Sequence, residues 1–531
     1  MVQLTNIYFN LFLIFYINSN VNGLYRILII SPFNMKSHNA MLETVGKALA
    51  LNGHKVDIIS HFELKNSIKN YTTIINLDGT MPQLVNSLTM KMIDYLRKLN
   101  IVSGLIEKFG SNYCELMSSE KIKKFIKNPP TDPPYDLVIT QAMSTNCYFA
   151  FGDVFNVPVV GVSPVAQFTW FDEILGNSMC NSYVANWETK NSQIKTFWDR
   201  VKNHFWTHYH NYRFFKDTEK NQTEAIRKYL NPNMANIREI EKKISLHLVN
   251  SYQSVFGIRP LSPAIVQIGG IQIELSESKI TPELKIWMDE STEGVIYFSL
   301  GSMVILEDFP KDVLLGIYAS FAKLSPMRIL MKILNNSTLP PGLPDNVLTM
   351  SWIPQIPILQ HKNTKVFITH GGLNSMMEAI SFAVPMIGFP FVSDQFLNIR
   401  TLAEKNVVYE MDYKEISEKT LDVALNAVLY DSKYRKAAKR ESQLFRDRPM
   451  NATKTAVFWI EYIIRNGANS LRSPTMDMPW WQAELVDVYG FIFISFLLIS
   501  YIIYRIMKNI TSHLYDIVNS SFQCQFKNYQ S

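Results

Sequence analysis

The stretch FITHGGLNSMMEAI, residues 367–380, places four polar side chains around one change of direction in the chain. An apolar run typical of a strand ends at His370, and two glycines lead into a segment with the pattern of a helix, which carries Asn374, Ser375 and Glu378. A glycine pair entering a helix lets the backbone approach a ligand and aims free N–H groups at an anion. A phosphate is therefore expected near Asn374 and Ser375, with His370 as a donor beside it.

Glu378 is the residue of this set that cannot bind phosphate. It follows Asn374 by four residues, so it shares that helical face one turn deeper. A carboxylate in such a place suits a pair of sugar hydroxyls, as ribose is held in other nucleotide sites. Phosphate and ribose together indicate a nucleotide.

Other predicted strands end in residues that fit the same ligand. Trp352 offers a flat stacking surface, and Gln355 an amide that both donates and accepts, as a uracil edge requires. Asp394 and Gln395 follow another strand and can bond hydroxyls, and Ser302 can meet a phosphate from a third loop. Each residue alone is equally typical of a turn, a core position or a helix cap, so the hypothesis depends on their common position at strand ends.

Two runs of alternating strands and helices must position these residues. The first half has continuously apolar strand-like segments at 26–32, 55–60, 135–140 and 157–163. Such segments suit a parallel sheet covered on both faces. The second half repeats the alternation, with strands predicted at 294–302, 327–333, 347–354, 365–372 and 384–390. The predicted fold class is α/β, with two doubly wound domains.

The segments between and beside these runs differ in kind. Residues 168–245 read as helical and unusually aromatic, and 254–274, with two prolines and a glycine pair, reads as an interdomain linker. His204, His208 and His210 have a spacing that could hold a metal, but a polar helix face is the favoured interpretation.

Both termini carry apolar segments. Residues 1–23 are predicted to be a signal peptide, with a first buried element as the alternative. At the other end, we expect a juxtamembrane segment at 466–487, a transmembrane helix at 488–504 and a tail at 505–531. The basic residues that follow residue 504 predict that this tail is cytoplasmic. Sequons for N-glycosylation stand at Asn70, Asn221, Asn335, Asn336 and Asn451. We therefore expect a single-pass type I protein of the endoplasmic reticulum membrane with lumenal domains.

Composition excludes several classes of function. The chain has 531 residues, a formal charge of +6 and no dense basic stripe, so nucleic acid is not an expected partner. The four cysteines are scattered and predict neither a metal site nor a disulfide framework. The sequence contains no two aspartates separated by one residue.

The segment from WIPQ to FLNI, residues 352–399, together with RILIISPFNMKSHNAM and YDLVIT, resembles the membrane-bound UDP-glycosyltransferases of animals, most of all those of insects. The resemblance covers nearly the whole chain. It implies two facing Rossmann-like domains, the GT-B arrangement. Residues 24–265 would bind a small lipophilic acceptor, and residues 266–465 a UDP-sugar co-substrate, with no cofactor. A homo- or hetero-oligomer is compatible with it.

The resemblance also assigns roles by motif match. The uracil is stacked on Trp352 and bonded by Gln355, and the ribose is held by Glu378. The transferred sugar is held by Asp394 and Gln395. The diphosphate is held by residues of two loops: Ser302, His370, Gly372, Asn374 and Ser375. UDP-glucose is the expected donor, with UDP-glucuronate left open, and the implied reaction is inverting and metal-independent.

The implied catalytic base is His38, which follows the first strand; a surface helix cap is the alternative interpretation. The family gives this histidine an aspartate partner, at the place of Gln141 or of Asn146 here. Because both are amides, two hypotheses stand: an active transferase, and a non-catalytic relative that binds UDP-sugar or a sister subunit. A soluble epimerase or phosphorylase on the same scaffold conflicts with both terminal segments.

Overall fold

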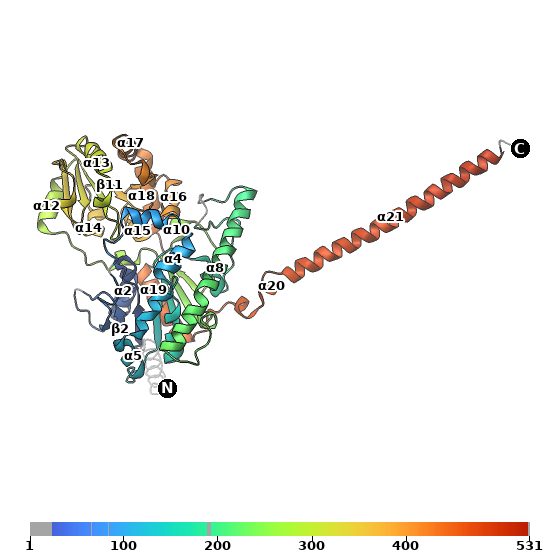
Figure 1. Cartoon of the computed structure of the whole chain (residues 1–531), viewed down its shortest axis with the longest axis horizontal. Coiled ribbons are helices and arrows are strands. Elements are labelled where there is room, and N and C mark those ends of the chain that lie inside the picture. The colour runs from blue at the N-terminus through green and yellow to red at the C-terminus, as the bar shows by residue number, and fades with distance from the viewer. Residues whose placement is uncertain (1–23, 65, 83, 188–192, 529–531) are drawn as a thin grey trace, which may run out of the picture. The chain divides into compact units, whose positions relative to one another are not determined.

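The computed structural model describes residues 24–64, 66–82, 84–187 and 193–528. The predicted signal peptide lies outside the described residues. The chain forms two compact units, Met1–Arg472 and Ser473–Ser531 (Figure 1).

A seven-stranded parallel sheet organises the N-terminal half of the first unit, in the order β3-β2-β1-β4-β5-β6-β7. Its strands are β1 Arg26–Ser31, β2 Lys55–Ser60, β3 Tyr71–Asn76, β4 Leu137–Gln141, β5 Val159–Ser163, β6 Ile244–Val249 and β7 Ile265–Gln267. Every residue of β1, β4, β5 and β6 is buried, because helices cover both faces. The helices of this half are α2 Lys36–Leu51, α3 Met90–Leu96, α4 Ile101–Phe109, α5 Glu120–Lys127, α6 Phe151–Phe155, α7 Thr169–Ile174, α8 Phe197–Tyr229, α9 Ile237–Glu241, α10 Gln253–Phe256 and α11 Ile271–Glu274.

A six-stranded parallel sheet organises the C-terminal half, in the order β10-β9-β8-β11-β12-β13. Its strands are β8 Val295–Ser299, β9 Arg328–Lys332, β10 Val347–Met350, β11 Thr364–Thr369, β12 Met386–Gly388 and β13 Val408–Glu410. Its helices are α12 Pro282–Glu290, α13 Lys311–Ala322, α14 Gln355–Gln360, α15 Leu373–Ser381, α16 Gln395–Ala403, α17 Glu418–Tyr430 and α18 Ser432–Arg446. The predicted α/β class with two parallel-sheet domains is confirmed.

Two segments pack against the half to which the sequence does not assign them. Helix α19, Ala452–Asn466, lies beside α2, and its buried face shares an apolar core with β1 and β2 (Figure 1). Its Glu461 accepts hydrogen bonds from Asn52 at 2.6 Å and lies 2.9 Å from Nε2 of His54. The predicted boundary at residue 465 therefore does not follow the packing. The predicted linker 254–274 differs as well, since it contributes β7 to the first sheet.

The second such segment is α3 and the loop before it. Leu88 and Ile93 lie in the core cluster of the second sheet, and Leu88 forms a parallel bridge with Val304. The Tyr413 hydroxyl donates to Asp94 at 2.8 Å. A piece of the first half is thus anchored on the second.

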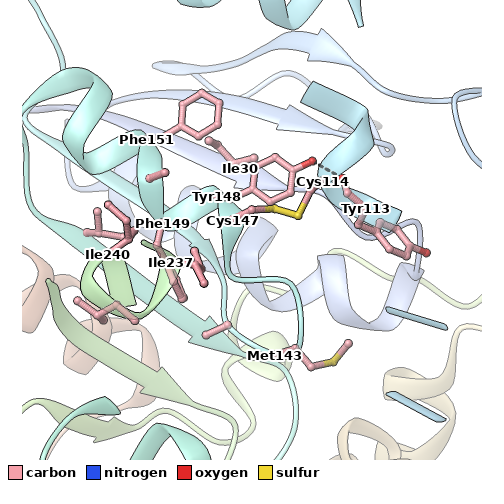
Figure 2. Packing of buried hydrophobic residues seen from close by; sticks show 14 of the residues in the cluster. Ile30, Tyr113, Cys114, Met143, Cys147, Tyr148, Phe149, Phe151, Ile237 and Ile240 are labelled. Atoms are coloured by element: carbon pink, nitrogen blue, oxygen red, sulfur yellow. Dashed lines mark hydrogen bonds between the residues drawn. A yellow bond between two sulfur atoms is a disulfide. The ribbon is translucent and has the colours of Figure 1, made fainter. Parts of the chain in front are cut away.

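A disulfide joins Cys114 to Cys147, so the sequence-based expectation of no disulfide framework was wrong. The cysteines lie in two short 3₁₀ helices, Ser111–Ser118 and Cys147–Ala150, and share an apolar core with Ile30 of β1 (Figure 2). The Tyr148 hydroxyl donates to the Tyr113 carbonyl at 2.7 Å alongside the bond. Sequence spacing could not show this contact, because the two cysteines are 33 residues apart.

The second unit contains α20, Trp480–Ala483, and α21, Val486–Asn528. Over Val486–Ser521, α21 is long and apolar enough to cross a membrane, and its most apolar window is not buried against protein. The predicted span 488–504 lies within this range.

Candidate active site

One cavity of about 1250 Å³ lies where the loops after the strands of the two sheets face each other. The sequence-predicted residues that line it come from both halves: His38, Ser302, Trp352, Gln355, His370, Gly372, Asn374, Ser375, Glu378, Asp394 and Gln395. Gln141 and Asn146 are fully buried and lie outside its lining. The predicted residues of the C-terminal half follow strand ends, and a parallel sheet collects such residues at one edge.

The ring of His370 is held between two glycines at the turn after β11. A Cβ on Gly301 would lie 2.5 Å from its Cε1, and a Cβ on Gly372 would lie 2.5 Å from its Nε2. No side chain fits at either position without displacing the ring. Gly371 has a φ of +83°, which lets the chain reverse tightly between strand and helix.

Burial, together with a smaller effect of the positive charge of Lys332, lowers the pKa of His370 to about 4. The imidazole is therefore neutral at physiological pH, and its Nδ1 has no hydrogen-bond partner among the described residues. It can donate to a phosphate but brings no charge. A positive charge near His370 comes from Lys332, the last residue of β9, which lines the same cavity. Its Nζ donates to Asn86 at 3.0 Å. Lys332 is not among the residues predicted from the sequence; it is the last but one residue of the predicted strand 327–333.

The first turn of α15 joins the two halves. Asn374 donates from Nδ2 to the carbonyl oxygen of Ser37 at 2.8 Å, and its Oδ1 accepts from Asn250 at 2.6 Å. Its amide is thus occupied by protein partners. The groups that can bind an anion at this helix end are the backbone N–H groups and the Ser375 hydroxyl. That hydroxyl accepts a hydrogen bond from Gln355 at 2.9 Å.

Glu378 lies one turn deeper in a cage of amides. Gln355 donates to its Oε2 at 2.6 Å, and Gln272 donates to its Oε1 at 3.2 Å. Burial raises the pKa of Glu378 to about 7, and these two hydrogen bonds partly oppose that rise. Oε1 of Gln355 also accepts from the Tyr297 hydroxyl at 3.2 Å. The two residues predicted to bind base and ribose are therefore coupled to each other.

The remaining donor-side residues lie in two loops. Trp352 is 45% exposed, and the ammonium of Lys36 lies 3.8 Å from its ring centre. Oε1 of Gln395 accepts from two backbone N–H groups of the loop before α16, which leaves its amino group for a ligand. Burial raises the pKa of Asp394 to about 6 against the opposing hydrogen bond from Asn398, at 2.8 Å.

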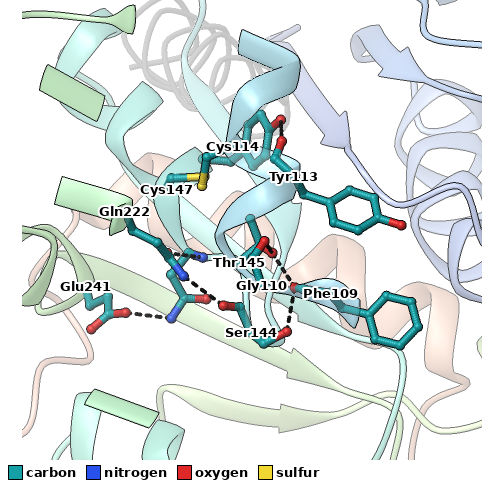
Figure 3. The surroundings of a disulfide bond; sticks show 11 residues. Phe109, Gly110, Tyr113, Cys114, Ser144, Thr145, Cys147, Gln222 and Glu241 are labelled. Atoms are coloured by element: carbon teal, nitrogen blue, oxygen red, sulfur yellow. Dashed lines mark hydrogen bonds between the residues drawn. A yellow bond between two sulfur atoms is a disulfide. The ribbon is translucent and has the colours of Figure 1, made fainter. Parts of the chain in front are cut away.

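His38 lies on the first turn of α2 and is half-buried at the cavity wall. Nε2 of Gln141 is 3.1 Å from its Nδ1, so Gln141 is the residue at the partner position. Asn146 bonds elsewhere: its amide donates to Glu241 at 2.6 Å, and its backbone N–H donates to Gln222. Figure 3 shows this buried network beside the disulfide, with Ser144 and Thr145 bonded to the Phe109 carbonyl.

Metal-binding side chains do not gather in the same way. The rings of His204 and His208 are 4.3 Å apart, edge to face, on α8. Within residues 24–64, 66–82, 84–187 and 193–528, no group of three or more His, Cys, Asp or Glu is placed to hold a metal ion.

Comparison with known proteins fits this geometry. The family model described as UDP-glucoronosyl and UDP-glucosyl transferase matches residues 29–520. The chain belongs to this family. UDP-glucosyltransferase 2 of Dactylopius coccus is 31% identical over 506 residues, which are 94% of this chain and 95% of that protein. UDP-glucuronosyltransferase 1A8 of Homo sapiens is 27% identical, over 88% of this chain and 89% of its own.

A solved structure supports the fold of this UDP-glycosyltransferase. The crystal structure of UDP-glucose: anthocyanidin 3-O-glucosyltransferase in complex with UDP superposes with a TM-score of 0.54 and 16% identity, covering 84% of this chain and all of the other. The two facing Rossmann-like domains therefore form a GT-B fold, as predicted. Family membership makes the chain a glycosyltransferase, an enzyme that transfers sugar from a UDP-sugar.

Proposed function

We propose that this UDP-glycosyltransferase transfers glucose from UDP-glucose to a hydroxyl of a small lipophilic acceptor, with inversion at the anomeric carbon. The observation that carries the proposal is the shared cavity, in which His38 of the first half faces the strand-end residues of the second. UDP-glucose is favoured over UDP-glucuronate because the relative with 31% identity is named a glucosyltransferase. The comparisons give no support to a non-catalytic relative.

Part of the cavity wall in the N-terminal half is apolar. Leu84, Leu88, Leu105, Phe109 and Phe168 line it in the N-terminal half. Apolar side chains there suit a ligand that gains affinity by leaving water rather than by many hydrogen bonds. This lining supports a lipophilic acceptor.

Inversion follows from a single displacement at the anomeric carbon. The acceptor oxygen would attack from the side of His38, and the diphosphate would leave toward the first turn of α15. The N–H groups of that turn and the ammonium of Lys332, which line the cavity, would stabilise the charge that develops on the diphosphate. Catalysis by this route needs no covalent sugar–enzyme intermediate.

We further propose that α21 anchors the chain in the endoplasmic reticulum membrane with the first unit in the lumen. The Cys114–Cys147 disulfide supports an oxidising compartment. The asparagines of the predicted sequons are exposed, so each is accessible to glycosylation: Asn70, Asn221, Asn335, Asn336 and Asn451.

The test uses membranes that contain the full chain, with labelled UDP-glucose, UDP-glucuronate and a panel of phenols. Glucoside formation is expected, and the anomeric proton coupling of the product should report a β-linkage. His38→Ala is expected to lower kcat/KM at least about 100-fold while UDP affinity stays within about twofold. UDP binding without transfer to any acceptor would reject the proposal.

A further inference from the structure

Gln141, the last residue of β4, contacts the histidine that faces the acceptor. Its amide nitrogen lies 3.1 Å from Nδ1 of His38, and its side chain is completely buried. An amide NH₂ can only donate, so Nδ1 must be the accepting nitrogen with a free lone pair. A neutral imidazole then carries its single proton on Nε2.

This tautomer is the opposite of the one that a general base requires. A carboxylate partner accepts a hydrogen bond from Nδ1–H and leaves a lone pair on Nε2, which can take a proton from the acceptor. With Gln141 as donor, Nε2–H faces the reaction and can only donate. Burial lowers the pKa of His38 to about 4, which keeps the ring neutral at physiological pH.

The alternative is a Gln141 side-chain amide rotated by 180°. It would place Oε1 at Nδ1 and restore a base. In the structure Oε1 points away from the histidine and has no hydrogen-bond partner in the part of the chain that the structure describes. The two orientations differ in which nitrogen of His38 carries the proton, so the choice of acceptor by the enzyme distinguishes them.

We propose that Gln141 is a positioning residue that restricts this transferase to acceptors whose attacking oxygen is already ionised, namely carboxylic acids and acidic phenols. The inference rests on the proposed function and names its acceptor class. The acceptor oxyanion forms the new bond to the anomeric carbon. The bond from that carbon to the diphosphate oxygen breaks, and UDP leaves with the electron pair. His38 donates a hydrogen bond from Nε2 to the oxyanion and keeps its proton throughout.

Charge near the entrance to this site is compatible with an anionic acceptor. Lys36 precedes His38 by two residues and places its ammonium over Trp352 at the cavity wall. The carboxylates of Glu43, Glu63 and Asp78 line the same half, and each has a partner. Glu43 pairs with Lys47 at 2.9 Å, Glu63 accepts from Asn76 at 2.9 Å, and Asp78 accepts from the Gly79 N–H at 3.0 Å.

The first experiment measures kcat/KM against pH for 4-nitrophenol and 4-methylphenol, which are similar in size but differ in acidity. The wild-type rate is expected to follow the ionisation of each phenol. It should rise about tenfold per pH unit for 4-methylphenol, which like tyrosine ionises near pH 10, and level off near neutral pH for 4-nitrophenol. Equal rates for the two phenols at pH 7 would overturn the inference.

Two variants of Gln141 separate its hydrogen bonding from its shape. Gln141→Glu has the same length and replaces the donor by an acceptor, so it should speed transfer to 4-methylphenol at pH 7 roughly 100-fold. Gln141→Leu has neither group and should give no such gain. Thermal unfolding and UDP affinity of each variant report whether the fold and the donor site are intact.

A readout without turnover tests the same inference if a variant fails to fold. The absorption spectrum of 4-nitrophenol bound to the wild-type chain with UDP is expected to show the anion, at a pH where the free phenol is half ionised. A neutral bound phenol would overturn the inference. Transfer to un-ionised phenols at full rate would reject the inference but keep the transferase. A bound anion with no transfer to any acceptor would reject the proposed function but support the placement of the Nε2 proton.

Discussion

Asn374 of α15 donates a hydrogen bond of 2.8 Å to the carbonyl oxygen of Ser37, the residue before His38. The same side chain accepts from Asn250, at the end of the first sheet, at 2.6 Å. The C-terminal half therefore holds the N-terminal turn of α2 and the histidine that it carries. The motif match assigns this asparagine to the diphosphate, but both ends of its amide are bonded to the other half of the protein.

Asn374→Ala is consequently expected to affect turnover more than UDP binding. Losing the bond to Ser37 and one of the two acceptors of the Asn250 amide costs about 1–2 kcal/mol, which corresponds to roughly a tenfold fall in kcat/KM. UDP affinity, measured by titration calorimetry, should change less than about threefold, because backbone N–H groups bind the phosphate. An equal loss in both quantities would show that the amide binds UDP directly.

Gly372→Ala tests the position of the His370 ring. The backbone of Gly372 has an ordinary φ of −61°, so the new methyl group causes no backbone strain and acts only by displacing the ring. Since Gly301 also lies close to the Cε1–Nε2 edge of the ring, the ring has little room to move, and UDP affinity should fall about tenfold or more. The control is His370→Ala, in which the same substitution should cost no further affinity.

Lys332→Met removes the charge of the β9 terminus but keeps an unbranched side chain. UDP affinity is expected to fall at least about tenfold, because a charge-assisted contact with the diphosphate is lost. Affinity for uridine, which has no phosphate, should stay the same. The pKa of His370 should rise, since Lys332 is one of the causes of its depression. A parallel loss of uridine affinity would mean that the variant disturbs the whole cavity.

Those parts of the fold that local patterns determine could be predicted from the sequence. The apolar runs at 26–32, 55–60 and 294–302 coincide with β1, β2 and β8, because strands buried on both faces have a continuous apolar signal. The strand β3 could not be predicted in this way. It reads YTTIIN and is only partly buried, so its pattern is half polar and lacks a continuous apolar signal. The lining of the cavity followed from the sheets, since strand ends meet at one edge.

Long-range packing could not be predicted. Nothing in α19 indicates that Ala456 and Ile460 belong to a core formed by strands some 400 residues earlier. Nothing in the spacing of Cys114 and Cys147 indicates that their helices meet. The same limit applies to Gln141 and Asn146, because only the three-dimensional contact shows which amide faces His38.

The disulfide predicts a measurable dependence on reduction. Cross-linking cysteines that are 33 residues apart restricts the unfolded chain, which in the chain-entropy model is worth about 3–4 kcal/mol. Replacing both cysteines by alanine, or adding a reductant, should lower the unfolding temperature of the first unit. Replacing the free Cys180 is the matched control and should leave that temperature unchanged. Equal melting of wild type and double variant would show that the bond does not form in the protein.

Glu378→Gln should raise the stability of the folded protein and lower its affinity for UDP. Burial raises the pKa of this carboxyl from 4.5 to about 7, so the folded state binds its proton more tightly than the unfolded state does. Stability therefore falls as pH rises from about 4.5 to 7, and the full penalty is present above 7. The amide removes the penalty, and Oε1 of Gln272, which has no partner among the described residues, can accept one of its new N–H groups.

At pH 8 the Glu378→Gln variant is expected to be more stable than wild type by roughly 1–3 kcal/mol, with little difference near pH 4. Its affinity for UDP should fall about 10- to 100-fold at pH 8, because ribose hydroxyls bond more strongly to a carboxylate than to an amide. Denaturant unfolding and calorimetry at the two pH values measure both effects. Glu404→Gln, at an exposed position after α16, is the control and should change neither. Lower stability of the variant than of wild type at pH 8 would contradict this prediction. It would show that the ionised Glu378 carboxylate stabilises the fold through its hydrogen bonds from Gln355 and Gln272.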